Sequence, residues 1–282
     1  MEIKNISRED AHEAYHKMVE FDLADLTADS KPGNDFVDYF TFPARLNTRA
    51  KRMGFSFYEF INDKEYLKRQ SVVKLIDYYK DNSLKTLYKI YKYQFGTVGL
   101  FRPIRAREVL SIYQHEIKTV LDPTAGWGCR MTGAASLDIP QYIGIDINPD
   151  LREPLTEMAE ELDHLGSQTN IKLLFEDAAT VDYTQLKYDC VFTSPPYFNT
   201  ELYVGTRKRT TREWLAWYQS VFSKIFENLQ PGGLMILNVP QDIYDSIFLI
   251  IFGKPETRIP LLKRNRGPPE YIYVWRKNLS LI

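Results

Sequence analysis

The sequence has few of the residues that build disulfide frameworks and metal centres. Its 282 residues include two cysteines, Cys129 and Cys190, and four histidines. Cys129 follows a glycine-containing segment and Cys190 lies in an apolar run, so we expect no disulfide framework. His12 and His16 have the spacing of helix neighbours, but no third ligand lies near them in the sequence. We therefore expect no metal.

Long apolar runs are also missing. No stretch approaches the roughly 20 apolar residues that a membrane-spanning helix needs. The first four residues, Met1-Glu2-Ile3-Lys4, lead into a charged segment that does not resemble a signal peptide. These absences predict an intracellular protein without a membrane partner, and they leave its oligomeric state open.

The net charge of −1 hides an uneven distribution of charge along the chain. Residues 1–40 contain ten acidic and four basic residues, whereas residues 41–107 contain five acidic and fifteen basic residues. Basic clusters can neutralise the phosphates of a nucleic acid, although many simply form a solvated surface. The candidate nucleic-acid-binding residues are Arg45, Arg49, Lys51, Arg52, Arg207, Lys208, Arg209, Arg212, Lys263, Arg264 and Arg266.

Strand and helix patterns alternate from residue 118 onward. We expect strands over residues 118–122, 141–146, 171–175, 188–192, 234–239 and 271–275, and helices over 129–137, 149–165 and 211–229. This alternation predicts an α/β fold with a parallel sheet and helices on both faces, and the last strands can add an antiparallel edge.

The first hundred residues have a different character. They contain few strand patterns and many aromatic residues, with helical stretches over 65–79 and 83–93. We therefore predict two parts, a mostly helical N-terminal module over residues 1–99 and an α/β domain over residues 100–282.

A glycine-containing loop, residues 122–128 (DPTAGWG), follows the first expected strand. Open α/β sheets bind their ligands at the carboxyl ends of the strands. Gly126 and Gly128 lack a Cβ atom and let the backbone turn sharply beside a ligand. Met131 stands where a dinucleotide fingerprint has its third glycine, which favours a cofactor without a pyrophosphate. Two glycines alone are weak evidence, because α/β proteins that bind nothing share them.

Acidic residues end the next two expected strands. Asp146 lies 24 residues after Asp122, where a carboxylate can accept hydrogen bonds from ribose hydroxyls. Asp177 ends the third strand, where it can meet an adenine amino group. S-adenosylmethionine fits this pattern, with Asp122 near its ammonium group, and NAD is the weaker alternative.

A second loop, residues 193–197 (TSPPY), follows the expected strand over 188–192. Its two prolines fix φ and remove two N–H donors, which leaves carbonyl oxygens as acceptors. Hydrogen bonds from an exocyclic amine to Ser194 Oγ and the Pro195 carbonyl would direct the nitrogen lone pair at a methyl donor. Tyr197 can stack on the base, with Phe198 or Tyr203 on its other face. A tight proline turn with a surface tyrosine is the purely structural alternative.

Together these motifs resemble the S-adenosylmethionine-dependent amino-methyltransferases of DNA, the N4-cytosine and N6-adenine group. The resemblance covers roughly residues 100–280. The segments AGWG and TSPPYF are similar to those of small solitary methylases of phages and other large DNA viruses. It implies a Rossmann-like methyltransferase sheet, S-adenosyl-L-methionine as cofactor and a double-stranded DNA partner with a flipped base. The location would be a bacterial cytoplasm or the host cell of a phage or virus. The residues implied are Phe101, Arg102, Pro103, Asp122, Thr124, Gly126, Gly128, Asp146 and Asp177 for the cofactor, and Ser194, Pro195, Pro196 and Tyr197 for catalysis.

The resemblance implies DNA methylation, as in restriction-modification, with the target base chosen by the first residue of the second loop. Ser194 favours cytosine N4, whereas Asp or Asn is usual there for adenine N6. A hydroxyl can serve either amine. Other readings are an RNA or protein amino-methyltransferase and a catalytically silent nucleic-acid-binding partner subunit. Only 65 residues separate Gly128 from Ser194, which leaves no room for a large recognition region. Recognition of the DNA sequence is therefore assigned to the N-terminal module and the basic loops.

Overall fold

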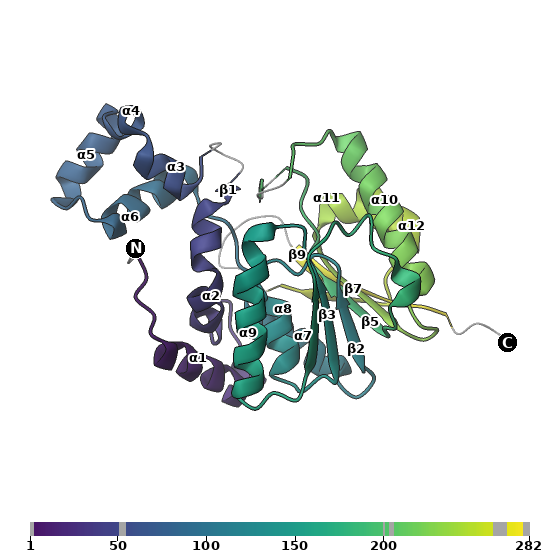
Figure 1. The fold of residues 1–282 in the computed structure, drawn as a ribbon. Helices are drawn as coiled ribbons and strands as arrows, with labels where there is room; N and C mark the ends of the chain where they lie inside the picture. Colours follow the sequence, from purple (N-terminus) through teal and green to yellow (C-terminus); the bar gives the residue numbers. More distant parts are fainter. Residues whose placement is uncertain (1–2, 51–54, 200, 203–205, 262–269, 279–282) are drawn as a thin grey trace.

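A seven-stranded mixed sheet forms the centre of the molecule (Figure 1). The computed structural model describes residues 3–50, 55–199, 201–202, 206–261 and 270–278. The strand order is β4-β3-β2-β5-β7-β9-β8. The five strands from β4 to β7 pair in parallel, and β9 is antiparallel to both β7 and β8. The strands are β2 Thr119–Asp122, β3 Gln141–Ile145, β4 Asn170–Leu174, β5 Cys190–Thr193, β7 Leu234–Pro240, β8 Thr257–Pro260 and β9 Glu270–Arg276. The predicted parallel sheet with an antiparallel edge is confirmed, and β8 is an additional strand that the sequence pattern did not indicate.

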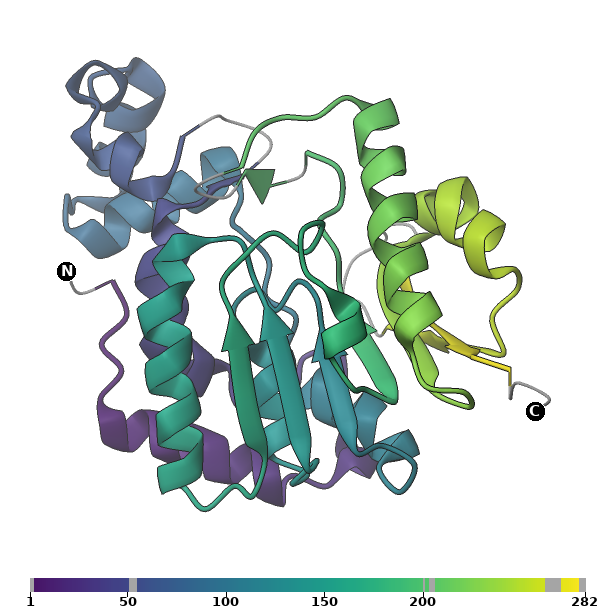
Figure 2. The same cartoon turned by 45° about the vertical axis from the view of Figure 1, so that its right-hand side comes forward.

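Helices cover both faces of this sheet (Figure 2). Adjacent residues of one strand serve opposite faces: Val120 joins one hydrophobic cluster and Leu121 the other. The Val120 side packs against α7 Pro103–Tyr113, α8 Cys129–Ala135 and α9 Arg152–His164, and the Leu121 side against α10 Thr211–Asn228. The short helices are η1 Leu23–Asp25, η2 Pro149–Leu151, η3 Tyr183–Gln185, α11 Gln241–Ile243, η4 Tyr244–Phe248 and α12 Leu249–Phe252. No helix of the described ranges is both long and apolar enough to cross a bilayer.

Local capping explains where two of the helical segments begin. Asn148 accepts a hydrogen bond from the Asp150 N–H and starts a short 3₁₀ turn, which leads directly into α9. Thr210 and Glu213 form a reciprocal capping box at the start of α10. Both starts agree with the sequence pattern. Helix α7 was not predicted. Pro103 occupies its first turn, a position in which proline is favoured.

The N-terminal helices belong to two different cores. Helices α1 Arg8–Glu20 and α2 Asn34–Asn47 pack into the same hydrophobic cluster as the sheet. Helices α3 Phe57–Asn62, α4 Lys64–Leu67, α5 Gln70–Tyr79 and α6 Leu84–Phe95 enclose a separate aromatic cluster and stand apart from the sheet in both views. The predicted helical character is confirmed, while the boundary at residue 99 stays a prediction.

A two-residue ribbon joins the N-terminal part to the second loop. Strand β1 Arg49–Ala50 pairs antiparallel with β6 Glu201–Leu202, which lies a few residues after Tyr197. The chain between α2 and α3 is thereby tied to the segment that follows the TSPPY motif (Figure 1).

Candidate functional site

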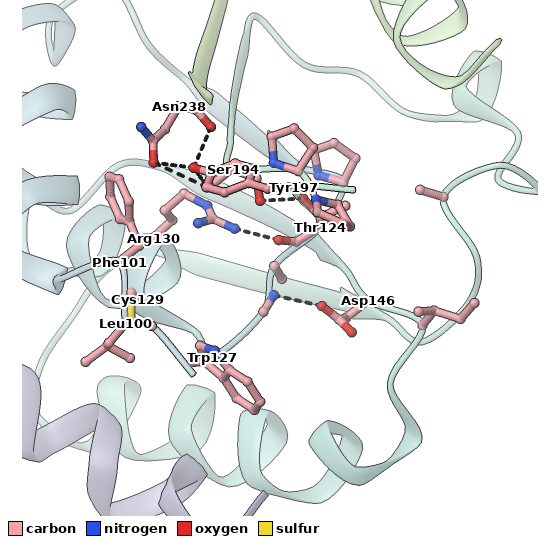
Figure 3. Close-up of a pocket in the computed structure, with 18 of the residues that line it drawn as sticks. Leu100, Phe101, Thr124, Trp127, Cys129, Arg130, Asp146, Ser194, Tyr197 and Asn238 are labelled. Atoms are coloured by element: carbon pink, nitrogen blue, oxygen red, sulfur yellow. Dashed lines mark hydrogen bonds between the residues drawn. The ribbon is translucent and has the colours of Figure 1, made fainter. Parts of the chain in front are cut away.

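A cavity of about 760 Å³ opens at the carboxyl ends of β2, β3, β5 and β7. Strand β2 runs between β3 and β5, so the chain order reverses at this point, where open α/β sheets bind ligands. The volume falls within the range typical of small-molecule sites. The lining includes ten residues that the sequence analysis singled out: Phe101, Arg102, Thr124, Gly126, Asp146, Asp177, Ser194, Pro195, Pro196 and Tyr197. Figure 3 shows part of this lining.

The two glycines of the first loop have different roles. Gly126 adopts a φ of +57°, and the nearest atom to a Cβ built on it is the Thr124 carbonyl oxygen at 3.9 Å, so the space beside it is open. Gly128 does not line the cavity. A Cβ at Gly128 would lie 2.8 Å from Met158 Sδ and 2.9 Å from Leu155 Cδ2 on α9. Gly126 is therefore suited to close approach by a ligand, whereas Gly128 lets α8 begin against α9.

Asp146 lies on the cavity wall and holds the first loop in place. Its Oδ2 accepts a hydrogen bond of 2.7 Å from the Gly126 N–H, and its Oδ1 accepts one of 2.8 Å from the Asn148 N–H. Burial raises the pKa of Asp146 to about 6, although these two N–H donors favour the ionised form. Asp177 also lines the cavity, and its Oδ1 accepts a bond of 2.9 Å from the Ala179 N–H. The two acids thus face one cavity, as the sequence pattern predicted.

Asp122 does not line the cavity, contrary to the expectation that it meets the cofactor ammonium group. Its carboxylate is fully buried and accepts hydrogen bonds from Arg130 at 2.6 and 3.2 Å, and from the hydroxyls of Thr193 and Tyr142 at 2.7 Å each. Burial by itself lowers the pKa of Arg130, but the charge of Asp122 outweighs burial and raises it. The pair therefore forms a buried support behind the cavity.

Arg130, which the sequence analysis missed, connects this support to the cavity. It lines the wall, donates a bond of 2.5 Å to the Thr124 carbonyl, and stacks over the Phe101 ring with 5.6 Å between its Cζ and the ring centroid. Its position eight residues after Asp122, in the first turn of the helix after the loop, was the available signal.

A chain of hydroxyl groups connects the two loops. Thr193 donates its hydroxyl proton to Asp122, so Thr124 must be the donor in the 2.7 Å bond between the Thr124 and Thr193 hydroxyls. The Thr124 hydroxyl also lies 3.3 Å from the Ser194 carbonyl. These contacts place the second loop in a defined position relative to the first.

Ser194 lies in a polar cluster with Tyr197 of the same loop and Asn238 of β7 (Figure 3), and Glu270 of β9 contacts both of these partners. Its Oγ lies 2.7 Å from the Tyr197 hydroxyl and 3.3 Å from Asn238 Oδ1. The Tyr197 hydroxyl also contacts the backbone and side-chain oxygens of Asn238, at 3.0 and 2.9 Å, and Glu270 Oε1 at 3.3 Å. Burial, assisted by the charge of Glu270, raises the pKa of Tyr197 well above its usual range. Tyr197 thus positions Ser194 through its hydroxyl, a role different from the predicted stacking.

Asn238 and Glu270 were not predicted. Asn238 is the one polar side chain in the otherwise apolar run over residues 234–239, and this contrast was a usable signal. Glu270 is the first residue of β9, and only the pairing of β9 with β7 brings it beside Asn238.

The two proline carbonyls face different surroundings. The Pro196 carbonyl accepts a hydrogen bond from the Tyr218 hydroxyl, which in turn accepts the Phe198 N–H at 3.2 Å. For the Pro195 carbonyl, no hydrogen-bond donor is found among the residues that the structure describes. Of the two, Pro195 is therefore the carbonyl available to a ligand.

An aromatic wall completes the cavity on the side of α10. Trp214 and Trp217 line it, and the guanidinium of Arg209 lies 4.7 and 5.6 Å from the centroids of their rings. Asn199 holds this wall, since its Oδ1 accepts bonds from the Arg209 N–H at 3.0 Å and Trp214 Nε1 at 3.1 Å. Phe198, expected to line the cavity, packs against Tyr218 instead. Tyr203 lies outside the described residues.

The predicted cationic residues are divided between several environments. Arg45 forms a buried ion pair with Asp38, and Arg49 pairs with Glu59. Arg207 lines the cavity beside its partner Glu213, at 2.7 Å, whereas Lys208 and Arg212 are exposed. The buried pair removes Arg45 from the set available to bind phosphates. Lys51, Arg52, Lys263, Arg264 and Arg266 lie outside the described residues.

The segment over residues 101–103, just before the sheet, also has residues in more than one environment. Phe101 and Arg102 line the cavity, but Pro103 is buried at the start of α7. The Arg102 guanidinium donates bonds of 2.5 and 3.0 Å to the carbonyls of Ala28 and Ser30. Within the described ranges, no group of three or more His, Cys, Asp or Glu side chains is placed to hold a metal ion.

Comparison with known proteins yields only distant likenesses. No family model and no curated protein matches the sequence. Among solved structures, TrmN from Thermus thermophilus is 20% identical with a TM-score of 0.44, over 64% of this chain and 50% of that one. The N-methyltransferase NodS from Bradyrhizobium japonicum is 11% identical with a TM-score of 0.44, over 62% and 94% of the two chains. A Listeria monocytogenes protein provisionally described as a class I S-adenosylmethionine-dependent methyltransferase is 15% identical with a TM-score of 0.47, over 96% and 90%. At TM-scores below 0.5, these likenesses decide nothing about activity.

Proposed function

We propose that this protein transfers a methyl group from S-adenosylmethionine to the exocyclic amine of a nucleobase, with cytosine N4 in DNA as the preferred target. One observation carries the proposal: two amine acceptors, Ser194 Oγ and the Pro195 carbonyl, line the same cavity as the nucleoside-binding pattern of Gly126, Asp146 and Asp177. The resemblance of both loops to the DNA amino-methyltransferases supports the same conclusion.

The chain's own groups fit the proposed cofactor. Asp146 offers a carboxylate to ribose hydroxyls, and Asp177 can accept an adenine amino group. The open space at Gly126 allows close approach to the backbone. When bound, S-adenosylmethionine supplies an electrophilic methyl group on a sulfonium centre.

The polar cluster orients Ser194 as an acceptor. Tyr197 donates its proton to Asn238, so its oxygen can accept the proton of Ser194. The lone pairs of Ser194 Oγ are then free for one amine N–H, and the Pro195 carbonyl can accept the other. With both N–H groups held, the nitrogen lone pair would be directed away from the loop, and positioning supplies most of the rate. The N–C bond would form as the methyl–sulfonium bond breaks, the sulfur would keep the electron pair as a neutral thioether, and the amine would release one proton to solvent.

The aromatic wall provides a surface for the target ring. Trp214 and Trp217 offer π-faces beside the cationic groups of Arg207 and Arg209. Stacking on aromatic side chains and contacts with cations are the usual means of holding an extruded base and its phosphates. This supports a flipped or single-stranded substrate.

Transfer of labelled methyl groups into unmethylated genomic DNA, followed by mass spectrometry of the nucleosides, tests the proposal. We expect N4-methylcytosine. N6-methyladenine would keep the mechanism but show that Ser194 does not select the base. Label in RNA alone would make the protein an RNA amino-methyltransferase. Cofactor binding without transfer to either nucleic acid would contradict the proposal.

The Asp146→Asn variant should lose affinity for the cofactor. Its amide would replace a carboxylate that accepts two ribose hydroxyls, and charge-assisted hydrogen bonds of this kind contribute about 1.5–3 kcal/mol each. We expect affinity for S-adenosylmethionine to fall at least about tenfold in calorimetry at pH 7.5. The exposed Asp163→Asn variant on α9 is the matched control, and equal affinities in the two variants would contradict the assignment of Asp146.

The pKa of Asp146 also predicts how the unmodified protein depends on pH. Because its pKa is raised to about 6 in the folded state, from about 3.9 when unfolded, ionisation opposes folding as pH rises through this interval. The contribution of this carboxyl to the free energy of unfolding should therefore fall as pH rises from about 4 to about 6, which thermal unfolding over this pH range measures. Affinity of the unmodified protein for the cofactor should decline as pH falls below about 6, where the carboxylate is protonated.

A further inference from the structure

A second cavity, of about 360 Å³, lies beside the first. Helices α2 and α6 form part of its walls, together with the segment over residues 97–102. Three residues line both cavities: Gly99, Leu100 and Arg102. The two spaces are therefore separated only by this short segment, and a chain-like ligand could occupy both.

The second cavity is strongly basic. Among the described residues that line it, Asp38 is the only carboxylate, and it is already paired with two of the cations, Lys4 and Arg45. The cationic residues on its wall are Lys4, Lys31, Arg45, Lys92 and Arg102. A concave surface lined by charges of one sign concentrates the electrostatic potential and attracts counter-ions.

Three of these cations are not neutralised by a carboxylate in any contact found in the described structure. Arg102 donates to the neutral carbonyls of Ala28 and Ser30. Lys92 lies 5.5 Å from the centroid of the Tyr88 ring, and Lys31 is exposed. Burial, together with the charge of Arg105, lowers the pKa of Arg102, which shows that its surroundings oppose a further positive charge. An anion in the cavity would relieve this repulsion.

We propose that the second cavity binds a backbone phosphate of the nucleic-acid strand whose target base enters the first cavity, through Lys31, Lys92 and Arg102. The inference rests on the proposed function. It favours a nucleic acid over a small anion because the shared wall places this phosphate next to the site that receives the base. Phosphate contacts of this kind fix the register of a strand without reading its sequence.

The surface outside the cavity agrees with this occupant. Helices α5 and α6 expose Tyr78 and Tyr93, which are 78% and 81% accessible and are suited to stacking on bases. Residues 64–95, which contain both helices, carry eight basic and three acidic residues. The nucleic-acid strand would therefore run along α5 and α6. The sequence analysis instead expected contacts around Arg45, whose guanidinium is buried against Asp38.

The Lys31→Ala/Lys92→Ala double variant tests the proposal in the full-length protein. Both side chains are exposed, so their loss should leave the core intact. We expect affinity for a mixed-sequence single-stranded DNA oligonucleotide to fall at least about tenfold. The slope of log K against log salt should decrease by up to about 0.7, since the variant loses one phosphate contact and each such contact to a single strand contributes about 0.7. Calorimetry should show unchanged S-adenosylmethionine affinity.

A control variant and three further results distinguish the inference from its alternatives. Lys224→Ala, an exposed lysine on α10 away from both cavities, should change neither quantity. Unchanged DNA affinity and slope in the double variant would overturn the inference while leaving the proposed function in place. Inorganic phosphate that binds the unmodified protein at this cavity without competing with DNA would show a free-anion site and also overturn it. If the unmodified protein binds no nucleic acid, the proposed function itself fails.

Discussion

The Ser194→Ala variant is expected to transfer methyl groups roughly 10²- to 10⁴-fold more slowly than the unmodified protein in single-turnover assays. The hydroxyl is the side-chain acceptor that holds the target amine, and positioned groups of this kind contribute about that factor. Asp146, Asp177 and Gly126 are untouched, so affinity for S-adenosylmethionine should not change. The loss should therefore appear in kcat and leave cofactor binding intact.

Two further variants separate the role of Ser194 from a general disturbance. Tyr197→Phe keeps the ring but removes the hydroxyl that contacts Ser194 and Asn238, and we expect a smaller loss of rate than in Ser194→Ala. Ser246→Ala, an exposed serine of η4, is the matched control and should be fully active. Full activity of Ser194→Ala would refute the proposed mechanism.

The Arg130→Met variant is expected to lose about 3–5 kcal/mol of unfolding free energy, because removal of one partner leaves a buried charge without compensation. Arg130 and Asp122 are 5% and 0% exposed, and the remaining donors to Asp122 are neutral groups, the hydroxyls of Thr193 and Tyr142 and the Thr124 N–H. Urea unfolding at pH 7.5 measures the change. A smaller secondary loss of cofactor affinity should follow, since Arg130 also holds the Thr124 carbonyl.

A comparison with an exposed ion pair tests the physical reason. Lys17→Met breaks the pair with Glu13, whose side chains are 65% and 62% exposed, and should cost less than about 1 kcal/mol. The Asp122→Asn/Arg130→Met double variant should be more stable than Arg130→Met alone, because no unpaired buried charge remains. Equal losses of unfolding free energy in Arg130→Met and Lys17→Met would show that the buried pair contributes no more to stability than the exposed pair.

The order of elements and the position of both loops could be read from the sequence. Alternating apolar periodicities are local properties, and each predicted strand of the sheet lies within two residues of its expected bounds. The carboxyl ends of parallel strands must meet at one edge of a sheet. The sequence therefore predicted that Gly126, Asp146, Asp177 and Ser194 would share one cavity, which is where the structure places them.

The roles of these residues depended on burial, which no local pattern encodes. Asp122 looked like a cofactor ligand, yet its burial required compensation by Arg130, Thr193 and Tyr142. Arg45 looked like a free cation until α2 folded it against Asp38.

The sequence by itself determined the α/β pattern, the two loops and the chemical groups that they present, because these follow from periodicity and backbone chemistry within a few residues. Only the tertiary structure decided which groups face the cavity and which support it. Glu270 reaches Tyr197 across 73 positions, and such a contact exists only after the strands pair and the charges find their partners. Burial then assigns each polar group its role, since a buried charge must be compensated and an exposed one need not be.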